Sequence, residues 1–243
     1  MRALLPFFLV LFPSVVSAFI SDDEIAVLQK ASAEWALGER IAFWAEQFVD
    51  TPYDTDPMGA YVTGKVIVAD DRVDCMYHVF RSVELAKGKD PADSLAAALD
   101  LRFPSRGVAE SGQVLNYENR FRYGEDMIES GKWGKEITSE MGETVKIRGG
   151  RNRQYVAMIK KRDIPSVLSK LRNGDIVFFI KDPAKRSADE IVGHMGIIKA
   201  EEGNIYLISA FGQKDRGGKV KKVLFSEYST GMPFVGIRVS RLE

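Results

Sequence analysis

The single cysteine of the chain, Cys75, is the first candidate for a reactive side chain. It follows Asp74 at the predicted start of a helix, where unpaired N–H groups and partial positive charge favour a thiolate and can bring a thiol pKa to about 3.5–7.5. The same N–H groups could receive the oxyanion of a tetrahedral intermediate. Because the charge of Asp74 opposes the thiolate, a base is still needed. The competing interpretation is a small, buried and inert side chain, a common role of free cysteine.

Two histidines are available as that base. His194 opens a predicted strand and is flanked by Gly193 and Gly196, which allow another segment to approach closely. An imidazole at this place can take the thiol proton and later return it to a leaving amine; the alternative is a histidine that only supports the structure. His78 lies one helical turn after Cys75, and helix geometry directs its side chain along the helix. We therefore favour a Cys75–His194 dyad and interpret His78 as a packing or supporting residue.

The composition is that of an ordinary globular protein and excludes several classes of function. The 243 residues include 34 Lys and Arg, 34 Asp and Glu, and 45% hydrophobic residues. A net charge of zero argues against a nucleic-acid partner bound through bulk phosphate neutralisation. One cysteine can form neither an internal disulfide nor a thiolate-rich zinc site, and the sequence has no HExxH, GxGxxG or phosphate-loop motif. We expect no metal ion and no organic cofactor.

Residues 1–18 have the pattern of a secretory signal peptide. Arg2 supplies the positive start, an apolar stretch follows, and Val16-Ser17-Ala18 offers the small residues of a cleavage site. The apolar stretch is too short to span a membrane of about 30 Å and contains two prolines. We expect cleavage after Ala18, a periplasmic or secreted product, and no stable membrane insertion after cleavage.

The remaining chain, residues 19–243, is predicted to be a single catalytic domain of the α+β class. Its first part, 19–165, is predicted to be helical, with helices over 22–48, 74–86, 91–101 and 123–132 and a short strand or extended segment over 64–69. The basic stretch Lys146–Arg153 is predicted to be a surface loop, with contact to an anionic ligand as the second interpretation. Its second part, 166–243, is predicted to be β-rich, with an antiparallel sheet of strands over 175–181, 194–200, 204–210, 219–224 and 234–241.

Several of these segments resemble a known enzyme superfamily. Gly174-Asp175-Ile176-Val177-Phe178-Phe179, followed by Gly193-His194-Met195-Gly196-Ile197, is similar to the second half of the NlpC-type cysteine peptidases, papain-like enzymes that cut bacterial cell-wall peptides. Thr51-Pro52-Tyr53 and Asp74-Cys75 are similar to the first half of these enzymes, in the expected order. A closer resemblance is to the AmiA-like N-acetylmuramoyl-L-alanine amidase family, whose pattern continues through Arg120, Tyr123 and Asp126 to residues 236–242. The resemblance covers most of residues 40–243.

The resemblance implies a papain-like fold, with helices that include the nucleophile helix packed on an antiparallel sheet. It implies that Cys75 is the nucleophile, that His194 is the general base, and that Tyr53 lies beside the sulfur and helps to polarise the substrate carbonyl. The third member of such a triad orients the histidine; Ser209 stands at the matching position, with Gln213 and Asn204 as the other candidates. The implied substrate is peptidoglycan or a muropeptide, and the implied bond is N-acetylmuramoyl-L-alanine.

The chain also departs from the family pattern. Ser209 and Arg122 stand where the family more often has histidine, and His78 stands where it more often has phenylalanine. Arg120 and Asp126 are interpreted first as a buried ion pair and second as direct substrate contacts. Two further functions therefore stay open: an endopeptidase that cuts within the stem peptide, between γ-D-glutamate and diaminopimelate, and a cell-wall-binding module without catalysis.

Overall fold

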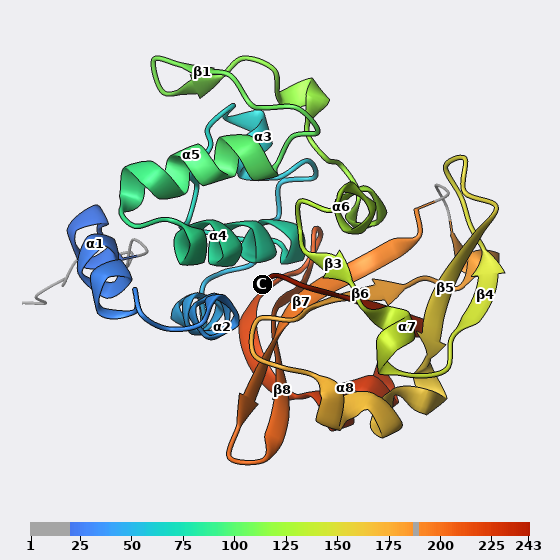
Figure 1. The fold of residues 1–243 in the computed structure, drawn as a ribbon. Helices are drawn as coiled ribbons and strands as arrows, with labels where there is room; N and C mark the ends of the chain where they lie inside the picture. The colour runs from blue at the N-terminus through green and yellow to red at the C-terminus, as the bar shows by residue number, and fades with distance from the viewer. Residues whose placement is uncertain (1–19, 187–189) are drawn as a thin grey trace, which may run out of the picture.

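The computed structural model describes residues 20–186 and 190–243 (Figure 1). The predicted signal peptide, residues 1–18, lies outside the described residues. The α-helices are α1 (Asp22–Ala31), α2 (Leu37–Gln47), α3 (Ala60–Thr63), α4 (Cys75–Lys87), α5 (Pro91–Leu101), α6 (Gly124–Ser130), α7 (Thr138–Met141) and α8 (Phe225–Gly231). Short 3-10 helices span Tyr117–Asn119, Lys161–Lys170 and Pro183–Lys185. The strands are β1 (Ala109–Glu110), β2 (Gln113–Val114), β3 (Lys135–Glu136), β4 (Val145–Arg148), β5 (Tyr155–Lys160), β6 (Ile176–Ile180), β7 (Val192–Glu201), β8 (Asn204–Gln213), β9 (Gly217–Leu224) and β10 (Gly236–Arg241).

One eight-stranded sheet carries most of the strands. Its order is β4-β5-β10-β6-β7-β8-β9, with β3 paired to β10, and every pairing in it is antiparallel. Helices α2 and α4 pack against β7 and β8, and α4 lies above the sheet between α2 and α5 in Figure 1. The predicted α+β class, with helices packed on an antiparallel sheet, is confirmed.

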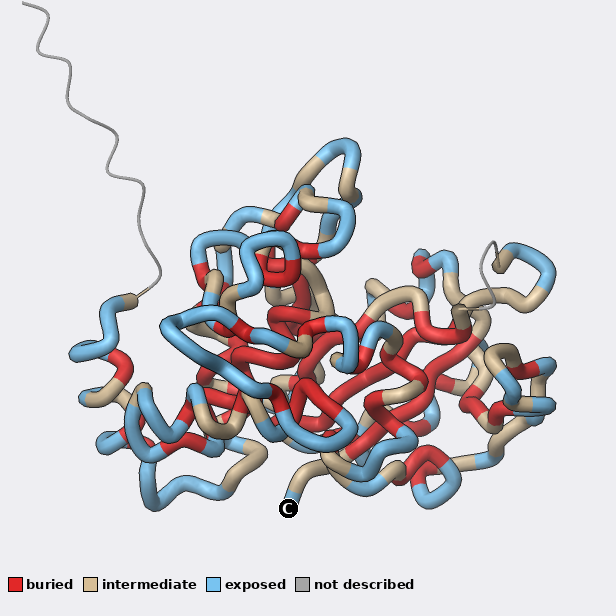
Figure 2. Tube along the Cα trace, turned by 90° about the horizontal axis from the view of Figure 1, so that it is seen from above, coloured by how far each residue is buried: buried red, intermediate tan, exposed pale blue. Residues whose placement is uncertain are grey.

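The central strand β6 is apolar throughout because both faces of the sheet are covered. Successive side chains of a strand point to opposite faces, and here Ile176 and Phe178 join the core under α4 while Val177 and Phe179 join a second core under α8. In Figure 2 the buried segments run continuously through the middle of the molecule, with exposed loops at its margins.

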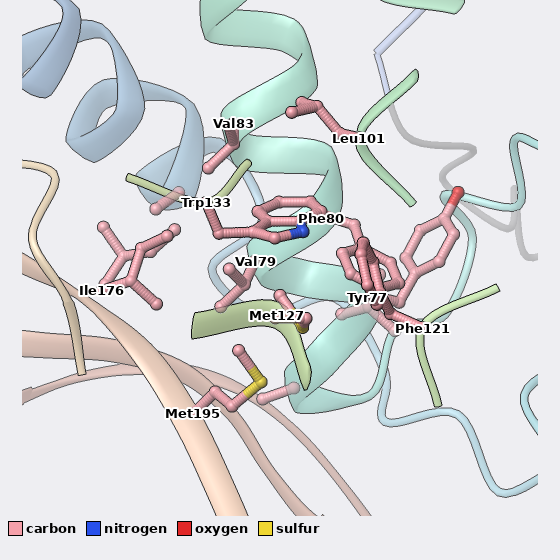
Figure 3. Close-up of a cluster of buried hydrophobic side chains, with 14 of the residues drawn as sticks. Tyr77, Val79, Phe80, Val83, Leu101, Phe121, Met127, Trp133, Ile176 and Met195 are labelled. Carbon is pink, nitrogen blue, oxygen red and sulfur yellow. The ribbon is translucent and has the colours of Figure 1, made fainter. Parts of the chain in front are cut away.

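Helix α4 positions the candidate nucleophile, and the helix itself is packed against several other segments. Asp74 is its N-cap: the carboxylate accepts the backbone N–H of Tyr77 at 2.9 Å, the standard way to satisfy one orphan donor of a helix start. Every residue from Tyr77 to Ala86 is buried. Figure 3 shows Val79 and Phe80 of α4 packed among Trp133, Ile176 and Met195, which come from three other segments. The first turn of α4 is therefore fixed relative to β7.

The middle of α4 also carries a buried network of charges. Arg81 binds Asp70 at 2.9 Å, and Glu84 binds Arg102 at 2.6 Å. All four side chains are at most 8% exposed. Removing one partner of such a pair leaves an uncompensated buried charge, which is strongly destabilising. This network locks α4 to the segments around it.

The predicted elements differ from the structure in three places. Residues 22–48 form two helices, because the chain turns at Ser32–Ala36 and so lets α1 reach α5 while α2 packs on the sheet. Residues 64–69 form no strand; 64 and 65 belong to a turn after α3, where Lys65 has a φ of 52°, and Ile67 is buried. The basic stretch is a loop only in part, because Lys146–Arg148 belongs to β4 and pairs with β5.

The division into a helical and a β-rich part is also less sharp than predicted. Residues 19–165 include the short strands β1 to β5, and residues 166–243 include α8. These strands are two to six residues long. Several obtain their partners from distant parts of the chain, which a local pattern does not reveal.

Candidate active site

Cys75 and His194 line the same cavity, of about 350 Å³, at the N-terminal end of α4. Asp74, Arg120 and Tyr123 line it as well. Cys75 is the first residue of α4 and is partly exposed, whereas His194 lies near the start of β7. The packing of α4 against β7 brings these two residues together from positions that are 119 apart in the sequence.

The neutral thiol of Cys75 is favoured over the thiolate. Its pKa is raised to about 12, chiefly by burial of the sulfur and next by the charge of Asp74, while the backbone of Met195 and the charge of Lys214 oppose this rise. Desolvation disfavours a charged group whatever its chain position. The expectation that the helix start holds a low thiol pKa is therefore wrong, because desolvation outweighs the helix end, whereas the predicted opposing effect of Asp74 is present.

Ser209 determines which nitrogen of His194 can act as a base. Its hydroxyl lies 3.2 Å from Nε2 of His194 and donates to the backbone oxygen of Met195 at 2.5 Å. A hydroxyl has one proton to donate, so Ser209 must accept the bond from an Nε2–H. The lone pair of the neutral imidazole is then on Nδ1, which is free to take the thiol proton.

A glycine makes this contact between strands β7 and β8 possible. A Cβ atom at Gly196 would lie 3.0 Å from the Cβ of Ser209 and 2.6 Å from a methyl carbon of Leu207. Of the three candidates for the third triad member, Ser209 is the one whose side chain bonds His194 within the described residues. Gln213 is the last residue of β8, and Asn204 is the first.

Aromatic rings surround His194. The ring of Phe234 is parallel to the imidazole at 6.1 Å, and those of Phe179, Phe211 and Tyr228 lie at 5.5, 5.3 and 6.3 Å. Burial lowers the pKa of His194 to about 4, and the charge of His78 would lower it further. Since no carboxylate hydrogen-bonds to His194 in the part of the chain that the structure describes, the resting pair is a neutral thiol and a neutral imidazole. Proton transfer must then accompany attack on the substrate rather than precede it.

His78 belongs to the core, as predicted. Its side chain is 0% exposed, its Nε2 lies 3.2 Å from the backbone oxygen of Ala45, and its ring meets Phe48 edge-on. Burial lowers its pKa to about 4. His78 does not line the cavity of Cys75.

Tyr53 lies near Cys75 on the loop before α3. Its backbone N–H donates to Gly218 at 2.9 Å, and a Cβ atom at Gly212 would lie 2.3 Å from its ring, so only glycine fits there. Burial and the nearby charge of Cys75 raise the pKa of Tyr53, so the phenol stays protonated and can donate. The backbone N–H groups of Cys75 and Met76, at the start of α4, have no hydrogen-bond partner within the helix. Cys75 and Met76 line the cavity, whereas Tyr53 is not among the residues that line it, so its contact with an oxyanion stays a prediction.

Lys214 offsets the charge of Asp74 beside the thiol. Its Nζ lies 3.3 Å from Oδ2 of Asp74, 3.0 Å from the backbone oxygen of Asp54, and 5.6 Å from the ring centre of Tyr53. Both oxygens of Asp74 therefore have protein partners. The sequence shows Lys214 only as part of a charged turn, so no local signal identified it, and the same is true of Tyr228 and Phe234.

Arg120 and Asp126 do not form the ion pair that the sequence suggested. Asp126 binds Arg151 at 3.0 Å and Arg153 at 2.9 Å, while Arg120 donates to the backbone oxygen of Tyr117 at 3.0 Å. The basic segment around residue 151 reaches Asp126 because β4 and β5 extend toward α6, which local sequence could not reveal. Asp126 lies outside the cavity of Cys75 and lines a neighbouring one.

No group of three or more His, Cys, Asp or Glu side chains in residues 20–186 and 190–243 is arranged to hold a metal ion. In the same ranges, no helix has the length and apolar character needed to cross a membrane.

Two comparisons, with protein-family models and with curated proteins, find no match. Solved structures do match. An N-acetylmuramoyl-L-alanine amidase from Bacteroides uniformis is 20% identical with a TM-score of 0.66, over 85% of this chain and 99% of that one. A Legionella pneumophila protein of the family DUF1460 is 16% identical with a TM-score of 0.70, over 90% of this chain and 93% of that one. A candidate xylanase from Bacteroides fragilis is 22% identical with a TM-score of 0.63.

The chain has the fold of these structures. At identities of 16–22%, the similarity shows the architecture alone. The chemistry of this chain must therefore be argued from its own cavity.

Proposed function

We propose that the protein is an exported cysteine amidase that hydrolyses an amide bond in peptidoglycan or in muropeptides. The observation that carries the proposal is that Cys75 and His194 line one cavity, with the buried hydroxyl of Ser209 on Nε2 of His194. The similarity to an amidase structure, together with the resemblance of the motifs around Cys75 and His194 to cell-wall hydrolases, supports the choice of substrate. Residues 1–18 support export.

The first half of the reaction forms a thioester. The sulfur of Cys75 attacks the carbonyl carbon while Nδ1 of His194 takes the thiol proton, so charge develops only during the attack. The N–H groups at the start of α4 and the hydroxyl of Tyr53 stabilise the oxyanion. The imidazolium then gives its proton to the leaving amine, and the C–N bond breaks.

The second half restores the enzyme. Water attacks the thioester carbonyl as Nδ1 of His194 takes one of its protons, and the carboxylic acid leaves as the proton returns to the sulfur. Because Ser209 holds the Nε2–H throughout, the same nitrogen serves in both halves. No step requires a metal ion or an organic cofactor.

We favour the bond between N-acetylmuramic acid and L-alanine, on the strength of the amidase resemblance. The bond between γ-D-glutamate and diaminopimelate is the second candidate, supported by the NlpC-type motifs. Digestion of purified muropeptides by the protein lacking residues 1–18, with product masses measured, separates the two. Cleavage at the first bond releases the whole stem peptide, and cleavage at the second leaves L-alanyl-D-glutamate on the sugar.

The matched control is the Cys75→Ala variant. We expect it to release no product under conditions in which the wild type digests the muropeptide completely. An intact muropeptide after incubation with folded wild-type protein would instead favour a binding module without catalysis.

A further inference from the structure

A second cavity, of about 550 Å³, adjoins that of Cys75 and is strongly basic. Arg120, Phe121 and Arg122 line both cavities, so the two are neighbours along this segment. The second cavity is hereafter the arginine cavity. Its five basic residues are Arg120, Arg122, Lys132, Arg151 and Arg153, against two acidic ones.

Arg120 and Arg122 line both cavities, and their side chains have no carboxylate partner among the described residues. Each donates to a backbone oxygen instead: Arg120 to Tyr117 at 3.0 Å and Arg122 to Glu118 at 3.2 Å. A guanidinium offers five donors in a fixed fork that matches a carboxylate. Most of the donors of both side chains therefore remain available to a ligand.

The basic segment after β4 completes the arginine cavity. Arg151 lies over the ring of Tyr123, with its guanidinium carbon 3.5 Å from the ring centre, and binds Asp126 at 3.0 Å. Its Nη1 is buried and has no partner among the described residues. Tyr123 itself lines the cavity of Cys75. The guanidinium is thus oriented by a ring and an ion pair while one of its nitrogens stays unused.

We propose that the arginine cavity binds free carboxylates of the stem peptide and so selects muropeptides whose carboxylates are not amidated. This inference rests on the proposed function. D-glutamate in a stem peptide is linked through its side chain, which leaves its α-carboxylate free and charged. One extended α-linked residue spans at most about 3.3–3.6 Å, so the α-carboxylate of the second residue lies within about 10 Å of the scissile bond, and the carboxylates of the third residue lie farther away, beyond the longer γ-link.

The test compares three substrates: N-acetylmuramoyl-L-alanyl-γ-D-glutamyl-diaminopimelate, its D-isoglutamine counterpart, and its diaminopimelate amide. The wild type should show a kcat/KM at least about tenfold higher for the first than for one of the amidated substrates, the loss expected for a charged hydrogen bond. Which amide is disfavoured identifies the carboxylate that is bound. In the double variant Arg120→Gln/Arg122→Gln the preference should fall below about twofold, mainly through a lower kcat/KM for the charged substrate.

The control is Arg162→Gln, which removes an equal charge from a side chain that is 77% exposed and lies outside both cavities. It should keep the wild-type preference. Equal kcat/KM for all three substrates in the wild type, or an undiminished preference in the double variant, would overturn the inference while leaving the amidase function in place.

A binding measurement keeps the two proposals separable. Calorimetric titration of the Cys75→Ala variant with the three substrates should give the same order of affinities, and Arg120→Gln/Arg122→Gln in that background should remove it. If the wild type cleaves none of the substrates, the proposed function fails, and the affinities still decide the inference. Equal affinities, or no binding, would then refute it.

Discussion

The two histidines of the chain share a lowered pKa but differ in exposure and surroundings: His78 is fully buried, and His194 is partly exposed. Burial lowers the pKa of both to about 4. His78 is enclosed by α2 and α4, with Nε2 on the backbone oxygen of Ala45 and Nδ1 without a partner among the described residues. His194 lines the cavity of Cys75, and Ser209 occupies its Nε2. A lowered pKa is therefore no mark of a catalytic base here; a place in the cavity of Cys75 separates the two.

The largest expected difference between the histidines is in turnover. His194→Ala should lower kcat/KM for muropeptide by about 10³-fold, since general acid–base catalysis contributes about 10²–10⁴-fold. His78→Phe, which keeps an aromatic ring beside Phe48, should stay within about threefold of the wild type, because His78 touches no reacting group. Steady-state kinetics on purified muropeptide measures both. Equal losses in the two variants would remove the distinction.

The second prediction concerns the pH dependence of folding, to which His78 contributes through its lowered pKa. Its pKa is about 4 in the folded protein against 6.5 for the model value, so the unfolded chain binds the proton first as the pH falls. The stabilising contribution is complete above pH 6.5 and is lost between about pH 6.5 and 4, by up to about 3 kcal/mol.

Urea unfolding at pH 7 and pH 4.5 provides the measurement. The wild type should lose about 2–3 kcal/mol more than His78→Phe between these two values. His194 is present in both proteins, so its own titration cancels in the comparison. If both proteins lose the same free energy of unfolding, His78 is already protonated or solvated in the folded state.

A third prediction concerns the hydroxyl of Ser209, which fixes the tautomer of His194. Ser209→Ala leaves Nε2 without an acceptor and allows the other tautomer, so kcat should fall about tenfold with little change in KM, the loss of one neutral hydrogen bond being about 1 kcal/mol. Ser82→Ala is the matched control, since Ser82 is also a buried hydroxyl that donates to a backbone oxygen, that of His78, at 2.7 Å. A Ser209→Ala enzyme with wild-type kcat would show that Ser209 only stabilises the fold.

The smallest expected effect concerns the thiol itself. Asp74→Asn keeps a side chain that can cap α4 but removes the charge that raises the pKa of Cys75. Alkylation by iodoacetamide at pH 8.5 should become about three to ten times faster, because the thiolate is the reactive form. The control Asp71→Asn, at an exposed aspartate that pairs with the neighbouring Arg72, should react at the wild-type rate. A slower rate in Asp74→Asn would mean that the capping charge of Asp74 supports the thiolate.

Much of the fold could be predicted from local pattern. The apolar strands after residue 171 and the helix that begins at Cys75 follow from hydrophobic runs and a capping aspartate, and both are present. The break between α1 and α2 could not be predicted, because it depends on which partners each helix finds in three dimensions. Strands β3 and β5 depend on the distant strand β10 in the same way.

The candidate site was predictable where a residue type is scarce. One cysteine and two histidines leave few possible dyads, and helix geometry set His78 aside. The electrostatics were not predictable: the raised thiol pKa comes from burial by segments remote in sequence. The partners of Asp126 and the position of Lys214 also depend on tertiary packing, which the spacing of residues does not encode.

The most direct test of the central claim is to trap the thioester on Cys75. Wild-type protein mixed with excess muropeptide and quenched in acid within milliseconds should gain the mass of the N-acetylmuramoyl group on the peptide that contains Cys75. His194→Ala should accumulate less of this adduct, and Cys75→Ala none. An adduct-free wild type that turns over at full rate, or a Cys75→Ala variant that still releases the stem peptide, would contradict the account.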